Sequence, residues 1–389
     1  MKFDYLALIL TFLFGILICI FPPFVASVYV PVYVRFPLLF ILTVFFLTIT
    51  IRRKKFVFRF GPYICFFIFE IIYWAFRGNI IIGEASYFIM YVMLASGLWV
   101  GIYRINGGKV LMGNMYILIV IAFSILSILS FIAYNLDLLP YTLETIGEDG
   151  FYTNFHNVIL GYISIRKFEF GTLGRVCGYL LEPSYLAWFL SVNFFMIDGF
   201  LKKRKHLLLA RVIVLLGALA TCSTMAWVVI PIVLFIKLVY KIMELMKISP
   251  RLSNILFSIG FVITLAIFFA FVPKQNLVDS LGTSSADDRE DRAGTSFLII
   301  ANSSVPDLLF GFSPGYIEKN VGKGESNQIV KLIVETGLIS TILILTFVVK
   351  CSYRSKYFMI ANLLFLNSVV ILLTPLFILN LLVCKWNDE

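Results

Sequence analysis

Charged residues are scarce in this 389-residue sequence. Only 14% of the residues are charged, whereas 60% are hydrophobic and the mean hydropathy is +0.96. A soluble domain of this length could not cover so much apolar surface with so few charged side chains. The scarcity of charge therefore excludes one large soluble core and predicts a polytopic membrane protein whose solvent is mostly lipid.

Histidine and paired cysteine are scarce as well. His156 and His206 lie far apart, and the six cysteines are scattered without a CxxC pair. Most of the cysteines sit within or at the ends of apolar runs, where a thiol behaves as a small hydrophobic side chain. We therefore expect neither a metal site nor a cofactor.

The net charge of +10 comes from basic residues in short runs between apolar stretches, such as "RRKK" from Arg52 and "KKRK" from Lys202. Basic patches interleaved with aromatic residues are lacking, which argues against nucleic acid as a partner. Short basic loops are typical of the cytoplasmic side of a membrane protein. They predict a cytoplasmic N-terminus, because most of the 32 basic residues then fall inside.

Apolar runs long enough to cross a bilayer predict about eleven spans (ten to twelve) in an all-α helix bundle, a single integral membrane domain over residues 1–389. We read the first run as a retained span rather than a signal peptide. The last run is long for one span and short for two, and Thr374-Pro375 could kink it. The expected spans are 5–21, 37–51, 61–76, 80–101, 111–134, 178–200, 207–222, 224–243, 254–272, 327–349 and 357–383.

Two long polar segments, 135–174 and 273–326, interrupt this pattern, and the charge distribution puts both on the outer side. Loops of such length are uncommon unless they are functional. The chemistry or the binding is therefore expected outside the membrane.

The stretch "GRVCGYLLEPSYLAWFL" places charges at the edge of an apolar run. If the helix begins at Pro183, Arg175, Gly178 and Glu182 lie in a capping turn or re-entrant segment at the outer surface. If it begins near Arg175, that residue and Glu182 share one helix face. Either way a cation and a carboxylate meet at the mouth of the bundle, as a functional pair or as a pair that only fixes the helix end.

A second group of polar residues follows the second long segment. Ser326 is a good N-cap for the next helix, and polar residues recur every four positions beyond it at Asn327, Lys331 and Glu335. Such a stripe would be costly against lipid and should face the bundle interior. Glu70, in the middle of "YICFFIFEIIYWAF", either bridges to a neighbouring helix or lines a cavity.

These motifs resemble those of bacterial oligosaccharide repeat-unit polymerases, in the group that includes the O-antigen polymerases and the O-antigen ligases. "RVCGYLLEPSYLA" resembles the arginine–glycine–Glu-Pro-Ser motif of that family, and "PDLLFGFSPG" followed by "LIVETGLIS" resembles its later motifs. The resemblance covers the last half to two-thirds of the chain. It implies catalytic roles for Arg175, Glu182, Arg289 and Arg292, and substrate contacts for Gly178, Ser184, Gly311, Gly315, Asn327, Lys331 and Glu335.

The resemblance implies a membrane glycosyltransferase that polymerises lipid-linked repeat units into O-antigen or capsule at the outer face of the cytoplasmic (inner) membrane. Both donor and acceptor would be oligosaccharides on undecaprenyl diphosphate, and no metal or cofactor takes part. A flippase and a chain-length regulator are implied partners. Arginines would hold the departing diphosphate, and Glu182 would orient the attacking hydroxyl or accept its proton.

The chain departs from this family at two positions. Ser326-Asn327 stands where ligases carry a histidine, which favours a polymerase, and the turn "TCSTMAW" lacks the arginine of a Ser-Arg pair. A ligase that moves finished glycan is the alternative within the class. A flippase for the same lipid-linked sugar and a non-catalytic scaffold are the alternatives outside it.

Overall fold

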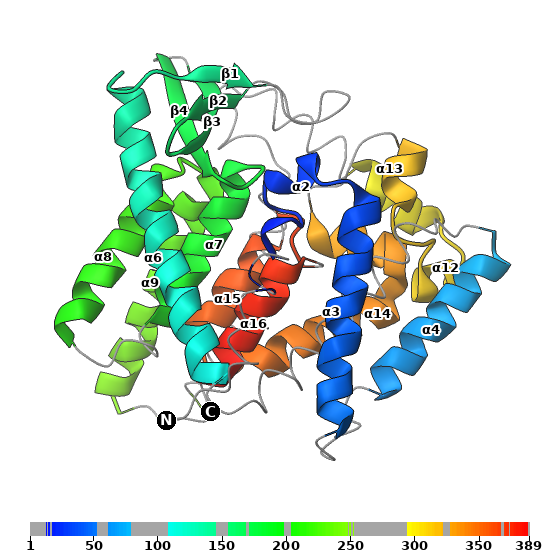
Figure 1. The fold of residues 1–389 in the computed structure, drawn as a ribbon. Helices are drawn as coiled ribbons and strands as arrows, with labels where there is room; N and C mark the ends of the chain where they lie inside the picture. Colours follow the sequence, from blue (N-terminus) through cyan, green and yellow to red (C-terminus); the bar gives the residue numbers. More distant parts are fainter. Residues whose placement is uncertain are drawn as a thin grey trace.

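A computed structural model describes residues 18–52, 61–78, 108–144, 155–168, 171–197, 204–247, 294–321, 327–366, 369–372 and 374–387, together with positions 13, 15, 249 and 252. This part of the chain is mostly helical and contains one small sheet (Figure 1). The expected spans at 5–21, 80–101 and 254–272 lie wholly or largely outside the described residues.

The helices agree with a membrane protein. Three segments are long and apolar enough to cross a bilayer: Leu111–Asn135, Thr224–Leu245 and Gln328–Ser352, and several apolar helices are shorter. The longer helices are α3 (Val32–Arg52), α4 (Gly61–Phe76), α6 (Gly108–Asn135), α7 (Pro183–Met196), α8 (Arg204–Ala220), α9 (Thr224–Leu245), α14 (Gln328–Ser352), α15 (Lys356–Phe365) and α16 (Pro375–Asn387). The short ones are α2 (Ala26–Tyr29), α12 (Val305–Phe310) and α13 (Tyr316–Val321).

Helix α7 begins at Pro183, one of the two starts that the sequence left open, and not at 178 where the expected span began. Its 14 residues give a length of about 21 Å, less than the roughly 30 Å of a hydrocarbon core. The helix is buried on nearly all sides, and it packs against α8, α9 and α15. Inside this core the indole Nε1 of Trp188 donates to Asn362 Oδ1 at 2.9 Å. It is therefore a central helix rather than a lipid-facing span.

The segment expected as an outer loop over 135–174 contains an antiparallel sheet. Its strands are β1 (Thr142–Glu144), β2 (Phe155–Val158), β3 (Gly161–Phe168) and β4 (Gly171–Gly178), which lie side by side in that order. Ile163 of β3 pairs with Val176 of β4, and both are fully buried. An all-helical reading missed the sheet because its apolar residues alternate with polar ones in short strands, so no apolar run is long enough to resemble a span.

The last apolar run is broken in two, as Thr374-Pro375 suggested. Pro375 begins α16, and Thr374 Oγ1 accepts a hydrogen bond from the Phe377 amide at 3.2 Å. The segment between α15 and α16 forms hydrogen bonds with the start of α14. The Gln328 amide donates to Leu366 O at 2.9 Å, and Gln328 Oε1 accepts from the Leu372 amide at 3.1 Å.

Small and polar residues fasten the helices to one another. Gly217 of α8 lies so close to α6 that an added Cβ would come within 2.7 Å of Ser124 Cα. Ser127 Oγ donates to Gly217 O at 2.9 Å in the same contact. In lipid, the hydrophobic effect does not drive helices together, because lipid tails are as apolar as the side chains. Helices there usually associate by close approach at small residues and by hydrogen bonds between helices.

Candidate functional site

The β4–α7 junction, residues 171–184, holds the first group of expected site residues. Strand β4 runs through Arg175 and Gly178, so neither lies in the capping turn or re-entrant segment that the sequence suggested. Both residues instead belong to the strand that pairs with β3, where Arg175 lies opposite Ser164. Glu182 has extended backbone (φ −142°, ψ 151°) and is the N-cap residue of α7.

The junction brings a cation and a carboxylate together around Cys177. Burial is the main reason why the pKa of the Cys177 thiol is raised; the nearby positive charge of Arg175 lowers it and the negative charge of Glu182 raises it. The charge of Arg175 also lowers the pKa of Cys222, which burial raises by more. The charge of Arg175, which belongs to β4, thus acts both on Cys177 of the same strand and on the turn that joins α8 to α9.

Glu182 and Ser184 form a direct pair. The Ser184 hydroxyl donates to Glu182 Oε2 at 2.6 Å, and Ser184 is buried whereas Glu182 is half-buried. The helix N-terminus adds the partial positive charge of its unsatisfied amides at the same place. A half-buried carboxylate, a guanidinium and a helix N-terminus can together hold a phosphate and a hydroxyl.

Gly178 allows the chain to turn from strand to helix. Its φ of 62° is in the left-handed region, and a Cβ on the neighbouring Gly161 would come within 3.0 Å of the Gly178 Cα. The close backbone approach accounts for Gly161, and the positive φ accounts for Gly178. A contact between Gly178 and substrate stays a prediction.

A segment near the N-terminus braces the junction, which the sequence did not indicate. The Leu181 amide donates to Pro23 O at 2.8 Å, and the Val25 amide donates to Tyr179 O at 2.9 Å. Phe24 and Leu180 form a bridge between these two hydrogen bonds. The backbone on both sides of the turn is thereby fixed before α7 begins.

The second group of expected residues lies at the α14 break, which we define as residues 305–321 together with 327–341. Gly337 has a φ of 76° inside α14 and interrupts the helix, and Gly311 has a φ of 71° directly opposite. A Cβ on Gly337 would come within 2.3 Å of Leu309 O, and a Cβ on Gly311 within 2.3 Å of Glu335 O. Only glycine fits at either position.

The break leaves helix carbonyls without their usual partners, and the "FGFSPG" loop supplies new ones. The Phe312 amide donates to Val334 O, and the Ser313 amide donates to Glu335 O, both at 3.0 Å. Gly315, with a φ of 82°, continues this loop into α13. Irregular backbone in a membrane helix is tolerated where other protein groups satisfy it in this way.

The polar stripe on α14 faces inward, as expected. Glu335 is 4% exposed, and Lys331 lies above it with its Nζ 4.0 Å from Glu335 Oε1. Lys331 also forms an ion pair with Glu318 of α13, which sequence reasoning missed. Burial alone would raise the pKa of Glu318, but the charge and the hydrogen bond of Lys331 hold it below its ordinary value.

Asn327, rather than Ser326, caps α14. Its Oδ1 accepts hydrogen bonds from the Ile329 amide at 3.0 Å and the Val330 amide at 3.2 Å. Ser326 lies outside the described residues, as do Arg289 and Arg292. The carbonyl oxygen of Asn327 is therefore occupied by the helix, and a substrate contact from its amide stays a prediction.

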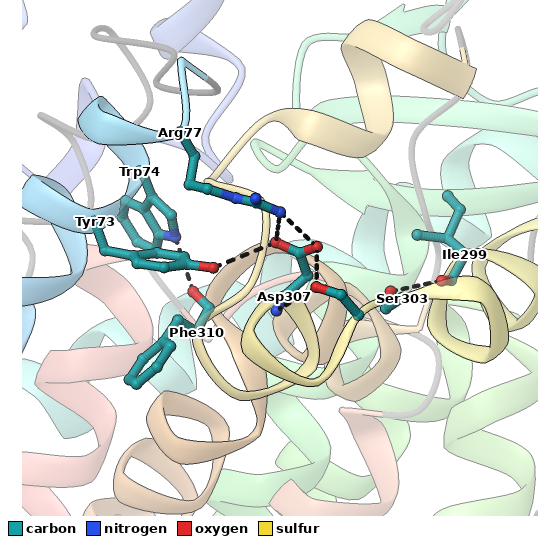
Figure 2. Close-up of polar contacts among 8 residues, drawn as sticks. Tyr73, Trp74, Arg77, Ile299, Ser303, Asp307 and Phe310 are labelled. Atoms are coloured by element: carbon teal, nitrogen blue, oxygen red, sulfur yellow. Dashed lines mark hydrogen bonds and ion pairs between the residues drawn. The ribbon is translucent and has the colours of Figure 1, made fainter.

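One face of α4 ties this helix to the α14 break (Figure 2). The Asp307 carboxylate accepts from Arg77 Nη2 at 2.6 and 2.7 Å, from Tyr73 at 3.3 Å and from Ser304 at 2.5 Å. Trp74 Nε1 donates to Phe310 O at 2.8 Å. Burial would raise the pKa of Asp307, but the hydrogen bonds of Ser304 and Arg77 and the charge of Arg77 lower it overall.

Glu70 belongs to the same face of α4 and bridges to α14, which was one of its two readings. The Ser340 hydroxyl donates to Glu70 Oε2 at 2.5 Å, and Glu70 is fully buried. Glu70, Tyr73, Trp74 and Arg77 follow the spacing of a single helix face, which is the signal that could have predicted this contact.

The two groups of expected residues lie in different parts of the fold. Figure 1 shows the sheet, which includes β4, above the start of α7 on one side of the molecule, and α12 and α14 beside α4 on the other. Within the described ranges, no group of three or more His, Cys, Asp or Glu side chains could hold a metal ion. Comparisons with protein-family models, curated proteins and solved structures found no match to this chain.

Proposed function

We propose that the protein polymerises undecaprenyl-diphosphate-linked oligosaccharide repeat units into O-antigen or capsule at the outer face of the cytoplasmic membrane. The observation that carries the proposal is the β4–α7 junction, where Arg175 lies on a strand that leads to Glu182 at the N-terminus of a buried helix, and where both charges act on Cys177. These residues belong to the motif through which the sequence resembles repeat-unit polymerases.

The proposed chemistry follows from the charges. A diphosphate leaving from C1 of the growing chain needs positive charge, which the Arg175 guanidinium and the α7 N-terminus supply. The attacking hydroxyl of the next repeat unit forms the new C1–O bond as the C1–O bond to phosphate breaks, and its proton passes to a carboxylate. Glu182 is our candidate, held by Ser184 at 2.6 Å. By the resemblance, Arg289 or Arg292 would supply a second guanidinium.

At the α14 break, the resemblance implies further substrate contacts from Gly311, Gly315, Lys331 and Glu335. The positive charge of Lys331 is already engaged there by Glu318, and its Nζ lies 4.0 Å from Glu335. Such a site suits sugar hydroxyls better than a diphosphate. We therefore place the diphosphate at the junction and assign the glycan, away from its lipid carrier, to the break.

The test is the length and sidedness of lipid-linked glycan in cells that carry Arg175→Ala. We expect single repeat units to accumulate on the outer face, and Arg175→Lys to restore little polymer because lysine lacks the bidentate fork. Arg354→Ala, an exposed arginine between α14 and α15, is the matched control and should leave long chains intact.

Other outcomes of the same measurement favour the alternatives. Long chains stranded on the carrier would indicate a ligase. Single units facing the cytoplasm would indicate a flippase, a reading that the fully buried Glu70 keeps open. Normal polymer in Arg175→Ala cells with normal protein levels would contradict the role of Arg175 in binding diphosphate.

A further inference from the structure

Helix α6 carries an exposed apolar stripe along one face. The stripe recurs every three to four residues, as one helix face requires. It consists of Leu118, Ala122, Ile125, Leu129, Ile132 and Leu136. The opposite face is buried against the core through Tyr116, Val120 and Ser127. Because α6 includes one of the segments that can cross a bilayer, the exposed stripe is its lipid-facing side.

The stripe does not stop where the helix ends. Leu136 and Leu138 are 64% and 63% exposed, and Tyr141 and Leu143 are 47% and 69% exposed. Only Leu139 of this stretch packs inward against the core. Residues 136–143 therefore extend the exposed apolar surface of α6 to the edge strand β1.

The length of α6 places this segment at the membrane surface. Its 28 residues span about 42 Å, roughly 12 Å more than the hydrocarbon core. Its C-terminal end is fastened to the sheet, because the Gly174 amide donates to Asn135 Oδ1 at 3.0 Å and Asn135 Nδ2 donates to Gly174 O at 3.5 Å. Figure 1 shows the sheet at this end of α6. The position of β1 along the membrane normal thus follows from that of α6.

We propose that residues 136–143 rest in the headgroup layer of the bilayer and hold the sheet against the membrane surface. The partner is lipid rather than a second copy of the chain, since exposed apolar residues continue directly from the lipid-facing stripe of α6 to β1. Tyr141 suits this layer because its ring is apolar and its hydroxyl polar, and the exposed Asp137 can reach water. The inference is independent of the proposed enzymatic activity.

Two adjacent positions on β1 make a matched test. Leu143 and Thr142 are both exposed, and successive strand residues point to opposite sides. Leu143→Cys and Thr142→Cys, in a cysteine-free background, are labelled with a small fluorophore in nanodiscs of phosphatidylcholine and phosphatidylglycerol. A quencher attached to the lipid near the headgroup should quench the label at 143 several-fold more than the label at 142, and aqueous iodide should show the reverse.

Equal quenching at the two positions, or stronger iodide quenching at 143, would overturn the proposal. Protection of 143 from both quenchers, with disulfide formation between copies of Leu143→Cys, would overturn it in favour of a dimer contact. If the cysteine-free protein fails to fold, Leu143→Trp and Thr142→Trp in the unaltered chain give the same comparison. Brominated lipid should then quench the added tryptophan at 143 more strongly.

Discussion

The β4–α7 junction and the α14 break are both places where regular structure ends inside the protein, and they solve that problem differently. At the break, backbone amides of the 312–313 loop satisfy the interrupted helix, and two glycines touch across it. At the junction, strand pairing holds the backbone up to Gly178, and the side chains of Glu182 and Ser184 bond one another. Consequently the break is sensitive to added volume, whereas the junction leaves the charged side chains of Arg175 and Glu182 half-buried.

The largest effect expected is on activity, at the junction. Glu182→Gln keeps the size and most hydrogen bonds of the side chain but removes its charge. If Glu182 takes the proton of the attacking hydroxyl, polymer formation should fall by about 10²–10⁴-fold without loss of protein. The measurement is the length distribution of lipid-linked glycan. Unchanged chain lengths would show that Glu182 only caps α7. The junction would then differ from the break in structure but not in function.

The next effect is on stability, at the break. Gly337→Ala places a Cβ 2.3 Å from Leu309 O at a φ of 76°. We expect a loss of about 3 kcal/mol or more, from backbone strain and from overpacking together. Thermal unfolding in detergent micelles measures it. Gly294→Ala, where an added Cβ meets nothing within 4 Å, is the control and should leave the melting temperature nearly unchanged.

A smaller effect on stability is expected from the ion pair between Arg77 of α4 and Asp307 of the break. The pKa of Asp307 is lower in the folded protein than its ordinary value of 3.8, so its ion pair stabilises the fold above that pH and the stabilisation is lost as pH falls. Asp307→Asn should cost about 1 kcal/mol at neutral pH. The difference in melting temperature between wild type and Asp307→Asn should shrink as the buffer is taken below pH 3.8. A constant difference would exclude a charge-based tie.

The smallest effect is expected in the sheet above the junction. Burial lowers the pKa of His156 from its ordinary value of 6.5, and its ring stacks on Tyr141 with centroids 4.3 Å apart. The unfolded chain binds a proton more readily, so stability should fall as pH drops below 6.5. His156→Phe should flatten this pH dependence of the melting temperature, whereas His206→Gln, at an exposed position, should not. Equal slopes would contradict the prediction.

Several features of the fold and candidate site were predictable from local sequence. Pro183 marked the start of α7, Thr374-Pro375 marked the break in the last apolar run, and the spacing of Lys331 and Glu335 placed them on an inward face. Each signal acts within a few residues: proline fixes φ and removes a donor, and a four-residue spacing defines a helix face. These features can therefore be predicted from a few adjacent residues of the sequence.

Tertiary structure alone decided which distant segments meet. Short alternating strands form a sheet only because β3 and β4 pair and bury Ile163 against Val176, a gain that neither strand has alone. Arg77 and Asp307 are 230 positions apart in the sequence, and nothing in the residues around either of them predicts their ion pair. The sequence by itself determined a membrane protein and the interruption at Thr374-Pro375, because these depend on local composition. Which glycines touch, which amides form hydrogen bonds and which charges pair across distant segments depends on how the helices pack.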